Sequence, residues 1–200
     1  MNTLLSRLDA IVLAGGQSRR MGQPKALLPW QGLTLVEATV DRLRPSFRRV
    51  LVVSKPGFPM PSLPATLVHD APHLSGPLAG LAAGLAASDA SYCFTLGCDM
   101  PFVEPRALAL MAEHLESVQA LALRLEGRVQ PLHAFYHRDC LPLAEALLSQ
   151  GRTSLMALLD HCHPRILDVE ALPDAEVCRR SLADLDTPQQ YQVALQELRA

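Results

Sequence analysis

The chain has 200 residues, of which 18 are basic and 20 acidic, so its formal net charge is −2, and hydrophobic residues make up 49% of it. A chain of this length can bury a sizeable core, and this composition excludes an intrinsically disordered protein. The near balance of charge argues against a general nucleic-acid-binding protein, so basic residues are expected to matter where they cluster.

The first predicted element is a buried strand over residues 10–14, Ala-Ile-Val-Leu-Ala. A short apolar run that ends at glycine is typical of a strand in a parallel sheet. Gly15 and Gly16 follow, and because neither has a Cβ, their backbone can point N–H groups at an anion placed close to the chain. Open α/β sheets bind ligands in loops at the carboxyl ends of central strands, so we predict a phosphate-binding loop here.

Three cations within seven residues, Arg19, Arg20 and Lys25, support this prediction because they suit a charge as dense as a triphosphate. The spacing excludes two familiar phosphate motifs. Gly22 is followed by Gln23 where a P-loop requires lysine, and the glycines do not form a G-x-G-x-x-G fingerprint. From the loop by itself, a glycine turn with solvated arginines stays open as the alternative.

Strands and helices alternate in the first half of the chain. Thr34 and Glu37 have the spacing of a capping box, which predicts a helix start after the threonine. Four prolines between residues 55 and 64 predict a surface loop. Predicted strands lie at residues 49–54 and 66–70.

A further helix is predicted after Ser75, with this serine as the N-cap and Pro77 near the first helical position. Gly80 and Gly84 permit this helix to approach a neighbouring element closely. We therefore expect the helix to lie against the sheet.

An apolar strand at residues 91–97 stops at a glycine and is followed by Cys98, Asp99 and Met100. An aspartate at the carboxyl edge of a central strand can offer an oxygen ligand to Mg²⁺. A turn aspartate before proline is the alternative, and the residues themselves leave both open.

The sequence shows no internal repeat, low-complexity tract or interdomain linker. We predict an α/β fold with one Rossmann-like three-layer domain over residues 1–200, in which helices flank a mixed, mostly parallel sheet. The predicted helices lie at residues 105–115, 140–149 and 154–160 and after Pro188, and the predicted strands at residues 119–125, 129–136 and 165–169.

The five cysteines form no C-x-x-C pair, and they predict reduced thiols in a cytoplasmic protein. No stretch approaches about eighteen uninterrupted apolar residues, so we predict no membrane-spanning segment. The run His161, Cys162 and His163 is not expected to bind a metal, because three adjacent residues cannot face one ion on a regular element.

The stretch LAGGQSRRMGQPKALLPWQG resembles the signature loop of the nucleotidyltransferases that activate sugars, alditols and pterins. Within that superfamily the chain is most similar to the molybdenum cofactor guanylyltransferases. Three later blocks, SGPLAGLAAGL, GCDMP and DLDTP, carry the same resemblance in the same order. The resemblance implies transfer of GMP from GTP to molybdopterin with release of pyrophosphate, which yields the guanine dinucleotide form of the molybdenum cofactor.

The resemblance also implies the site. Mg²⁺ is the implied cofactor, with Asp99 and Asp186 as its ligands, and Asp186 stands where the family usually has asparagine. Lys25 is expected to neutralise the phosphates, and we place Arg20 with Lys25 and Asp99 in the catalytic set. The implied nucleotide-binding residues are Leu13, Ala14, Gly15, Gly16, Lys25, Ser54, Asp70 and Asp99.

Several alternatives stay open at this point. The stretch PKALLPW is also common in related cytidylyltransferases, so a cytidylyltransferase or a sugar-phosphate nucleotidyltransferase of the same fold is one alternative. A non-catalytic nucleotide-binding regulator or chaperone is another. Transient contact with the enzyme that supplies the pterin, or with a recipient apoenzyme, is a further hypothesis. His133 is either an acceptor-binding residue or a half-buried strand histidine, and Trp30 is expected to be packed.

Overall fold

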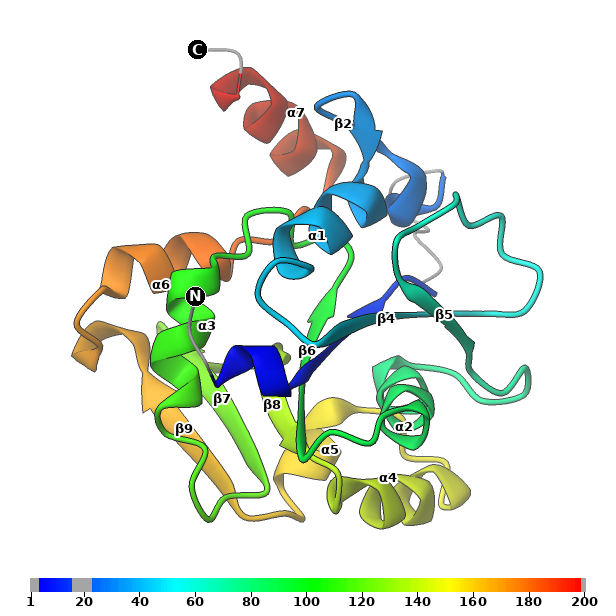
Figure 1. Cartoon of the computed structure of the whole chain (residues 1–200), viewed down its shortest axis with the longest axis vertical. Helices are drawn as coiled ribbons and strands as arrows, with labels where there is room; N and C mark the ends of the chain where they lie inside the picture. The colour runs from blue at the N-terminus through cyan, green and yellow to red at the C-terminus, as the bar shows by residue number, and fades with distance from the viewer. Residues whose placement is uncertain (1–3, 16–22, 199–200) are drawn as a thin grey trace.

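The computed structural model describes residues 4–15 and 23–198. Its main sheet has seven strands in the order β5-β4-β1-β6-β8-β7-β9 (Figure 1). In this sheet β8 is antiparallel to both of its neighbours, whereas the other pairs are parallel. The strands are β1 (Asp9–Leu13), β4 (Arg49–Ser54), β5 (Thr66–His69), β6 (Tyr92–Gly97), β7 (Ala120–Leu125), β8 (Arg128–His137) and β9 (Pro164–Asp168), and a separate hairpin is formed by β2 (Pro29–Trp30) and β3 (Leu33–Thr34).

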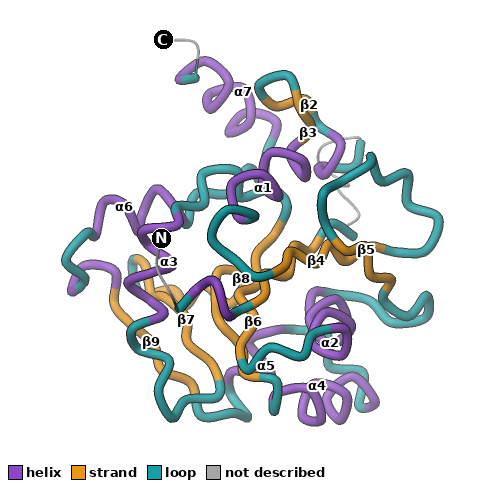
Figure 2. Tube along the Cα trace, in the orientation of Figure 1, coloured by secondary structure: helices purple, strands orange, loops and turns teal. Residues whose placement is uncertain are grey.

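Helices cover both faces of the sheet, and a hydrophobic core lies under each layer. One core joins the sheet to α1, α3 and α6, and the other joins it to α2, α4 and α5, which lie together on one side in Figure 2. The predicted mostly parallel mixed sheet between two helical layers is therefore confirmed. The helices are α1 (Leu35–Leu43), α2 (Pro77–Ala87), α3 (Pro105–Ala112), α4 (Cys140–Ser149), α5 (Leu155–Leu159), α6 (Ala175–Ser181) and α7 (Pro188–Glu197). None of the helices in the described part of the chain is both long and apolar enough to cross a membrane.

The continuous apolar run of β1 is explained by burial on both faces. Ala10 and Val12 belong to the core under α1 and α3, whereas Ile11 belongs to the core under α2. All three are fully buried. A parallel strand that is covered on both faces needs apolar residues at every position, which is why no alternation appears in the sequence.

Helix α2 packs closely on β1, as its glycines predict. A Cβ added to Gly84 would lie 2.6 Å from Cδ1 of Ile11, and one added to Gly80 would lie 2.9 Å from Cδ2 of Leu13. Both distances are shorter than real Cβ contacts. A larger residue at position 84 would meet three atoms of Ile11 and push α2 away from β1, whereas one at position 80 would require the end of the Leu13 side chain to move.

The predicted cap of α2 is wrong, although Pro77 does occupy the first turn. Gly76 is the N-cap residue, with φ of +82°, and Ser75 lies one position before it. A Cβ on Gly76 would lie 2.7 Å from Cβ of Thr153, and the backbone N–H of Leu78 donates to the carbonyl oxygen of Thr153. Close approach of a distant segment therefore demands glycine at the cap, and local sequence preference does not reveal that approach.

Other elements differ in extent or are not predicted. The capping box of Thr34 and Glu37 is confirmed at the start of α1, but α3 ends at Ala112, short of the predicted residue 115. The hairpin β2–β3 and helix α6 have no counterpart in the prediction. Trp30 is packed as expected, with its ring centroid 5.4 Å from that of Phe102 in an edge-on contact.

A buried carboxylate anchors the amino end of β1. Asp9 is fully buried, and its oxygens accept hydrogen bonds from Arg48 at 2.9 and 2.8 Å, from Arg49 at 2.9 Å and from the Ser88 hydroxyl at 2.6 Å. Burial by itself would raise the pKa of Asp9, but these hydrogen bonds lower it below its ordinary value. The charged form of Asp9 therefore stabilises the fold.

Replacing Asp9 with asparagine is expected to lower the free energy of unfolding by about 2 kcal/mol, because a buried charged acceptor is lost. Since the pKa of Asp9 is lowered in the folded state, its contribution is present above about pH 4 and is lost as the pH falls further. Urea denaturation between pH 3 and pH 7 measures both effects. Asp89→Asn is the matched control, since the exposed Asp89 pairs with the same two arginines. An equal loss of stability in both variants would contradict the prediction.

Candidate functional site

The carboxyl ends of two parallel strands form the floor of the site. Leu13 at the end of β1 is in register with Gly97 at the end of β6, and the backbone N–H of Cys98 donates to the carbonyl oxygen of Leu13 at 3.1 Å. On the other side, the N–H of Ala14 donates to the carbonyl oxygen of Val53 at 2.8 Å. β1 lies between β4 and β6, and the later strands are added outward from it on both sides. The carboxyl end of β1 is therefore the topological switch point, where open α/β sheets bind ligands.

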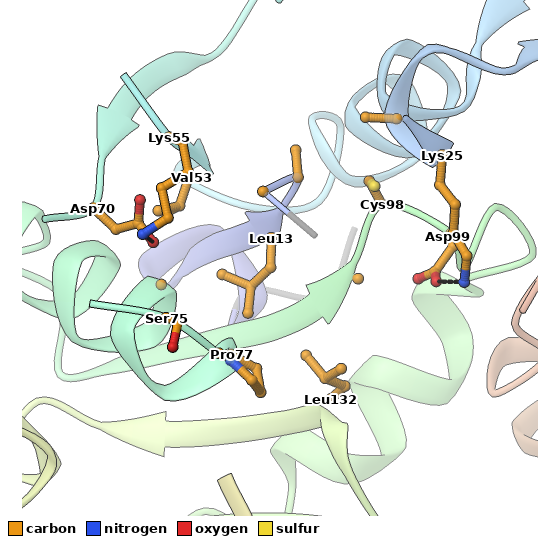
Figure 3. A pocket seen from close by; sticks show the side chains of 16 residues that line it. Leu13, Lys25, Val53, Lys55, Asp70, Ser75, Pro77, Cys98, Asp99 and Leu132 are labelled. Atoms are coloured by element: carbon orange, nitrogen blue, oxygen red, sulfur yellow. Dashed lines mark hydrogen bonds and ion pairs between the residues drawn. The ribbon is translucent and has the colours of Figure 1, made fainter. Parts of the chain in front are cut away.

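A pocket of about 740 Å³ opens over this edge (Figure 3). Its walls come from the ends of β1, β4 and β6, the start of α2 and the first half of β8. The site residues predicted from the sequence that line it are Leu13, Ala14, Gly15, Lys25, Asp70 and Asp99.

Four other predicted site residues are not among the described residues that line the pocket: Gly16, Arg20, Ser54 and Asp186, of which Asp186 pairs with the lining residue Lys25. Gly16 and Arg20 lie outside the described residues. Ser54 is buried and does not line the pocket, and its hydroxyl donates to the carbonyl oxygen of Lys55 at 3.4 Å. A nucleotide contact by Gly16, Arg20 or Ser54 stays a prediction.

At one end of the pocket a lysine lies between two carboxylates, of which Asp99 lines the pocket and Asp186 does not. Nζ of Lys25 lies 2.7 Å from Oδ2 of Asp99 and 2.6 Å from Oδ1 of Asp186. Burial would lower the pKa of Lys25, but the hydrogen bonds to Asp186 and Asp99 raise it instead. The structure thus brings together three residues that the resemblance assigns to the phosphate and metal site.

Backbone contacts hold the two aspartates at this end. A Cβ on Gly97 would collide with Oδ1 of Asp99, so the glycine leaves room for the carboxylate to fold back over the strand end. The N–H of Leu185 donates to the carbonyl oxygen of Asp99 at 2.9 Å, which brings the DLDTP segment and Asp186 to the edge of the sheet.

These residues fit a magnesium ion. Two carboxylate oxygens converge on the Lys25 ammonium, which stands in for a cation between Asp99 and Asp186. Mg²⁺ prefers such hard oxygen ligands and usually takes one or two carboxylates, with water and substrate phosphates in its other positions. The described residues contain no cluster of three His, Cys, Asp or Glu side chains arranged for a metal, so phosphate and water oxygens would have to complete the coordination.

A third carboxylate, Asp184, lies in the same electrostatic environment. Asp184 is exposed, and its pKa is raised by partial desolvation and by the charges of Asp186 and Asp99. No role is predicted for Asp184 from the sequence, although it is the first residue of the DLDTP block. The concentration of negative charge at this end favours cations, which matches a metal site.

The opposite end of the pocket holds a second lysine and aspartate. Lys55 directly follows β4 and pairs with Asp70 at 3.0 Å, and Figure 3 shows this pair and the Lys25–Asp99 pair on opposite sides of Leu13. Lys55 was not among the predicted site residues. The signal that could have found it is its scarcity, because the chain has two lysines and both line this pocket.

His133 is a core residue and makes no contact with the pocket. It is fully buried, its Nε2 lies 2.8 Å from the hydroxyl oxygen of Ser181, and burial lowers its pKa to about 4. Its neighbour Leu132 lines the pocket instead, since successive residues of a strand point to opposite faces. The acceptor-binding alternative for His133 is therefore wrong, and so is its expected half-burial.

Comparison with known sequences identifies relatives along most of the chain. The family described as "MobA-like NTP transferase domain" matches residues 10–166. The chain's relatives include curated proteins named "Probable molybdenum cofactor guanylyltransferase". The one from a Geobacillus species is 31% identical over 193 residues, which cover 94% of this chain and 97% of its own. The one from Bacillus cereus is 32% identical over 179 residues, which cover 85% of this chain and 90% of its own.

Solved structures share the fold. Molybdopterin-guanine dinucleotide biosynthesis protein A from Archaeoglobus fulgidus has a TM-score of 0.80 at 23% identity, covering 94% of this chain and 96% of its own. The 2-C-methyl-D-erythritol 4-phosphate cytidylyltransferase from Thermus thermophilus has a TM-score of 0.69 at 21% identity, covering 96% of this chain and 98% of its own. At these identities the likenesses show the fold alone, and they agree with the predicted α/β architecture.

Proposed function

The chain belongs to the MobA-like NTP transferase family, and from this premise we propose that it transfers GMP from GTP to molybdopterin, with release of pyrophosphate. The product is the guanine dinucleotide form of the molybdenum cofactor. Relatives of about one third identity, named as probable molybdenum cofactor guanylyltransferases, support this activity. The structural observation that carries it is Lys25 between Asp99 and Asp186, at the switch-point edge of a nucleotide-sized pocket.

The two ends of the pocket suit the two ends of a nucleotide. The Lys25 end offers a cation and two metal-binding carboxylates, so we place the triphosphate there. The Asp70 end offers a carboxylate and apolar wall, so we place the nucleoside there, with the backbone of residues 13–15 beneath it. We assign Arg20 to the phosphates on the strength of the sequence prediction.

The reaction needs positioning and charge neutralisation more than covalent chemistry. An oxygen of the acceptor's terminal phosphate attacks the α-phosphorus of GTP, and the bond from that phosphorus to the oxygen bridging to the β-phosphorus breaks. Mg²⁺ bound by Asp99 and Asp186 would supply electrostatic stabilisation of the phosphate oxygens. Lys25 neutralises the phosphates, and the rigid strand ends hold the two anions in line.

Pyrophosphate release tests the function directly. Purified protein is incubated with Mg²⁺ and molybdopterin and with GTP, CTP, ATP or UTP in turn, and pyrophosphate and the dinucleotide product are measured. We expect release with GTP and none above background with the others. Release with CTP would overturn the base assignment but keep the reaction class. GTP binding without release from any nucleotide would support the non-catalytic regulator instead.

We further propose a cytoplasmic location, which suits the five buried free thiols. Transient contact with the enzyme that supplies the pterin or with a recipient apoenzyme is proposed on chemical grounds, because such contact would protect an unstable intermediate. Copurification under conditions that preserve weak complexes tests that contact.

A further inference from the structure

The proposed reaction uses Lys25 and leaves the other lysine without a role. We infer that Lys55 is a positioning residue: it fixes the Asp70 carboxylate, and this fixed carboxylate makes the site prefer guanine over cytosine. The inference rests on the proposed function, because it concerns how the same site selects its nucleotide.

The Lys55 ammonium contacts one short segment of the protein at three acceptors. Its Nζ donates to the carbonyl oxygen of Ala71 at 3.0 Å and to that of Leu74, and it pairs with Oδ2 of Asp70 at 3.0 Å. An ammonium has three N–H donors, and the two carbonyl oxygens use two of them. The charge of the ammonium lies against Asp70, so we expect the effect of Lys55 on a nucleotide to pass through the segment that it holds.

That segment would otherwise be weakly tied to the sheet. It begins directly after β5, the edge strand, and the N–H of Asp70 donates to the carbonyl oxygen of Ser54 at a long 3.2 Å. Lys55 adds contacts at the start and at the end of residues 70–74. Because the lysine follows β4 directly, it connects this segment to the rigid centre of the sheet.

Lys55 also determines which oxygen of Asp70 is available. The side chain of Asp70 is 9% exposed, and Oδ2 is taken by Lys55. Oδ1 is buried and has no hydrogen-bond partner among the described residues. A buried carboxylate oxygen without a donor is costly, so a ligand that brings N–H groups to it gains the energy of a charge-assisted hydrogen bond.

Guanine and cytosine differ in what they offer such an oxygen. The edge of guanine carries a ring N–H and an amino group on adjacent atoms, and both are donors. The matching edge of cytosine carries two acceptors beside its amino group, so it faces a carboxylate with lone pairs. A site built around a fixed acceptor therefore rejects the base that lacks matching donors. When Lys55 no longer holds it, the carboxylate can turn away, and this discrimination weakens.

The test compares GTP and CTP affinities by calorimetry with Mg²⁺, for the unaltered protein and for Lys55→Met. We expect Lys55→Met to weaken GTP binding about tenfold and to change CTP binding less than about twofold, in line with the loss of one well-placed hydrogen bond to a charged group. Asp70→Asn is expected to lose about as much of the preference for GTP over CTP as Lys55→Met does. The double variant should be no worse than Asp70→Asn, because both changes remove the same interaction.

Arg42→Met is the matched control. Arg42 makes an ion pair of 2.8 Å with Glu104 and donates to the carbonyl oxygen of Val103 at 2.8 Å, and none of these residues lines the pocket. The Arg42→Met variant should prefer GTP over CTP to the same degree as the unaltered protein. Lys55→Arg keeps the charge but not the three-donor geometry, so an intermediate preference is expected. This variant carries the test if Lys55→Met does not fold.

The outcomes separate the inference from the proposed function. Equal losses for GTP and CTP in Lys55→Met would overturn the positioning role and indicate a phosphate contact. Additive losses in the double variant, or an unchanged preference in Lys55→Arg, would also overturn it. If the unaltered protein itself shows no preference for GTP, the proposed guanylyltransferase function fails together with the inference.

Discussion

Replacing Asp99 with asparagine is expected to reduce the rate of pyrophosphate release from GTP by about 10³-fold, because the site loses the charge that binds the metal and orients Lys25. We expect the fold to be kept for two reasons. Asparagine has nearly the same size as aspartate, and the hydrogen bond donated by the Leu185 N–H is accepted by the backbone of residue 99, which the substitution does not change. Steady-state kinetics with GTP, molybdopterin and varied Mg²⁺ measure the effect. The Mg²⁺ concentration for half-maximal rate should rise as well.

Asp186→Asn is the matched control for Asp99→Asn. Both aspartates contact Nζ of Lys25, but the side chain of Asp186 is 54% exposed and that of Asp99 is 20% exposed. The resemblance also places asparagine at this position in the family, so an amide oxygen should serve there. We expect Asp186→Asn to lose about tenfold or less in rate, in keeping with the weaker electrostatics of an exposed group. If the two variants lose equal activity, or if Asp99→Asn keeps most of its rate, the assigned metal roles are wrong.

Replacing Lys25 with methionine is expected to lower turnover about 10²-fold for every nucleotide that the enzyme accepts, because the lost charge neutralises phosphates and not a base. This separates it from Lys55→Met, which should alter base preference. Hydrogen bonds to Asp186 and Asp99 raise the pKa of Lys25 above its ordinary value, so its charge is present throughout the neutral range and is lost only as the pH rises through this raised pKa. The pH–rate profile of the unaltered enzyme should therefore show no lysine ionisation near neutrality.

Lys25→Met also has a readout that needs no turnover. In the free protein the Lys25 ammonium occupies the space between Asp99 and Asp186, where it competes with a divalent cation. Its removal should strengthen the binding of Mn²⁺, used as a spectroscopic probe for Mg²⁺, in the absence of nucleotide. Weaker Mn²⁺ binding in Lys25→Met would contradict a shared cation site at these carboxylates.

The local features of this protein were predictable because each depends on residues close together in the sequence. The buried strand before Gly15 follows from an unbroken apolar run, and the start of α1 follows from the capping box of Thr34 and Glu37. Asp99 was found as a site candidate because it follows a strand that stops at a glycine. Such patterns reflect backbone preferences and burial, which act within one element.

Other features depend on which segments the fold brings together. Lys25 and Asp186 are 161 positions apart in the sequence. The backbone hydrogen bond from Leu185 to Asp99 brings the neighbouring Asp186 to the same edge of the sheet as Lys25. The glycine cap of α2 follows from the approach of Thr153, and the burial of His133 follows from the strand face on which it lies.

The sequence by itself therefore determined the α/β architecture, the order of its main elements and the residue types at the phosphate end of the site. That the two lysines of the chain lie at opposite ends of one pocket, each paired with an aspartate, is apparent from the three-dimensional structure and not from the sequence. Each lysine–aspartate pair joins residues from segments that are distant in the sequence. The geometry of these pairs therefore depends on how the sheet and its helices pack, which no local sequence pattern predicts.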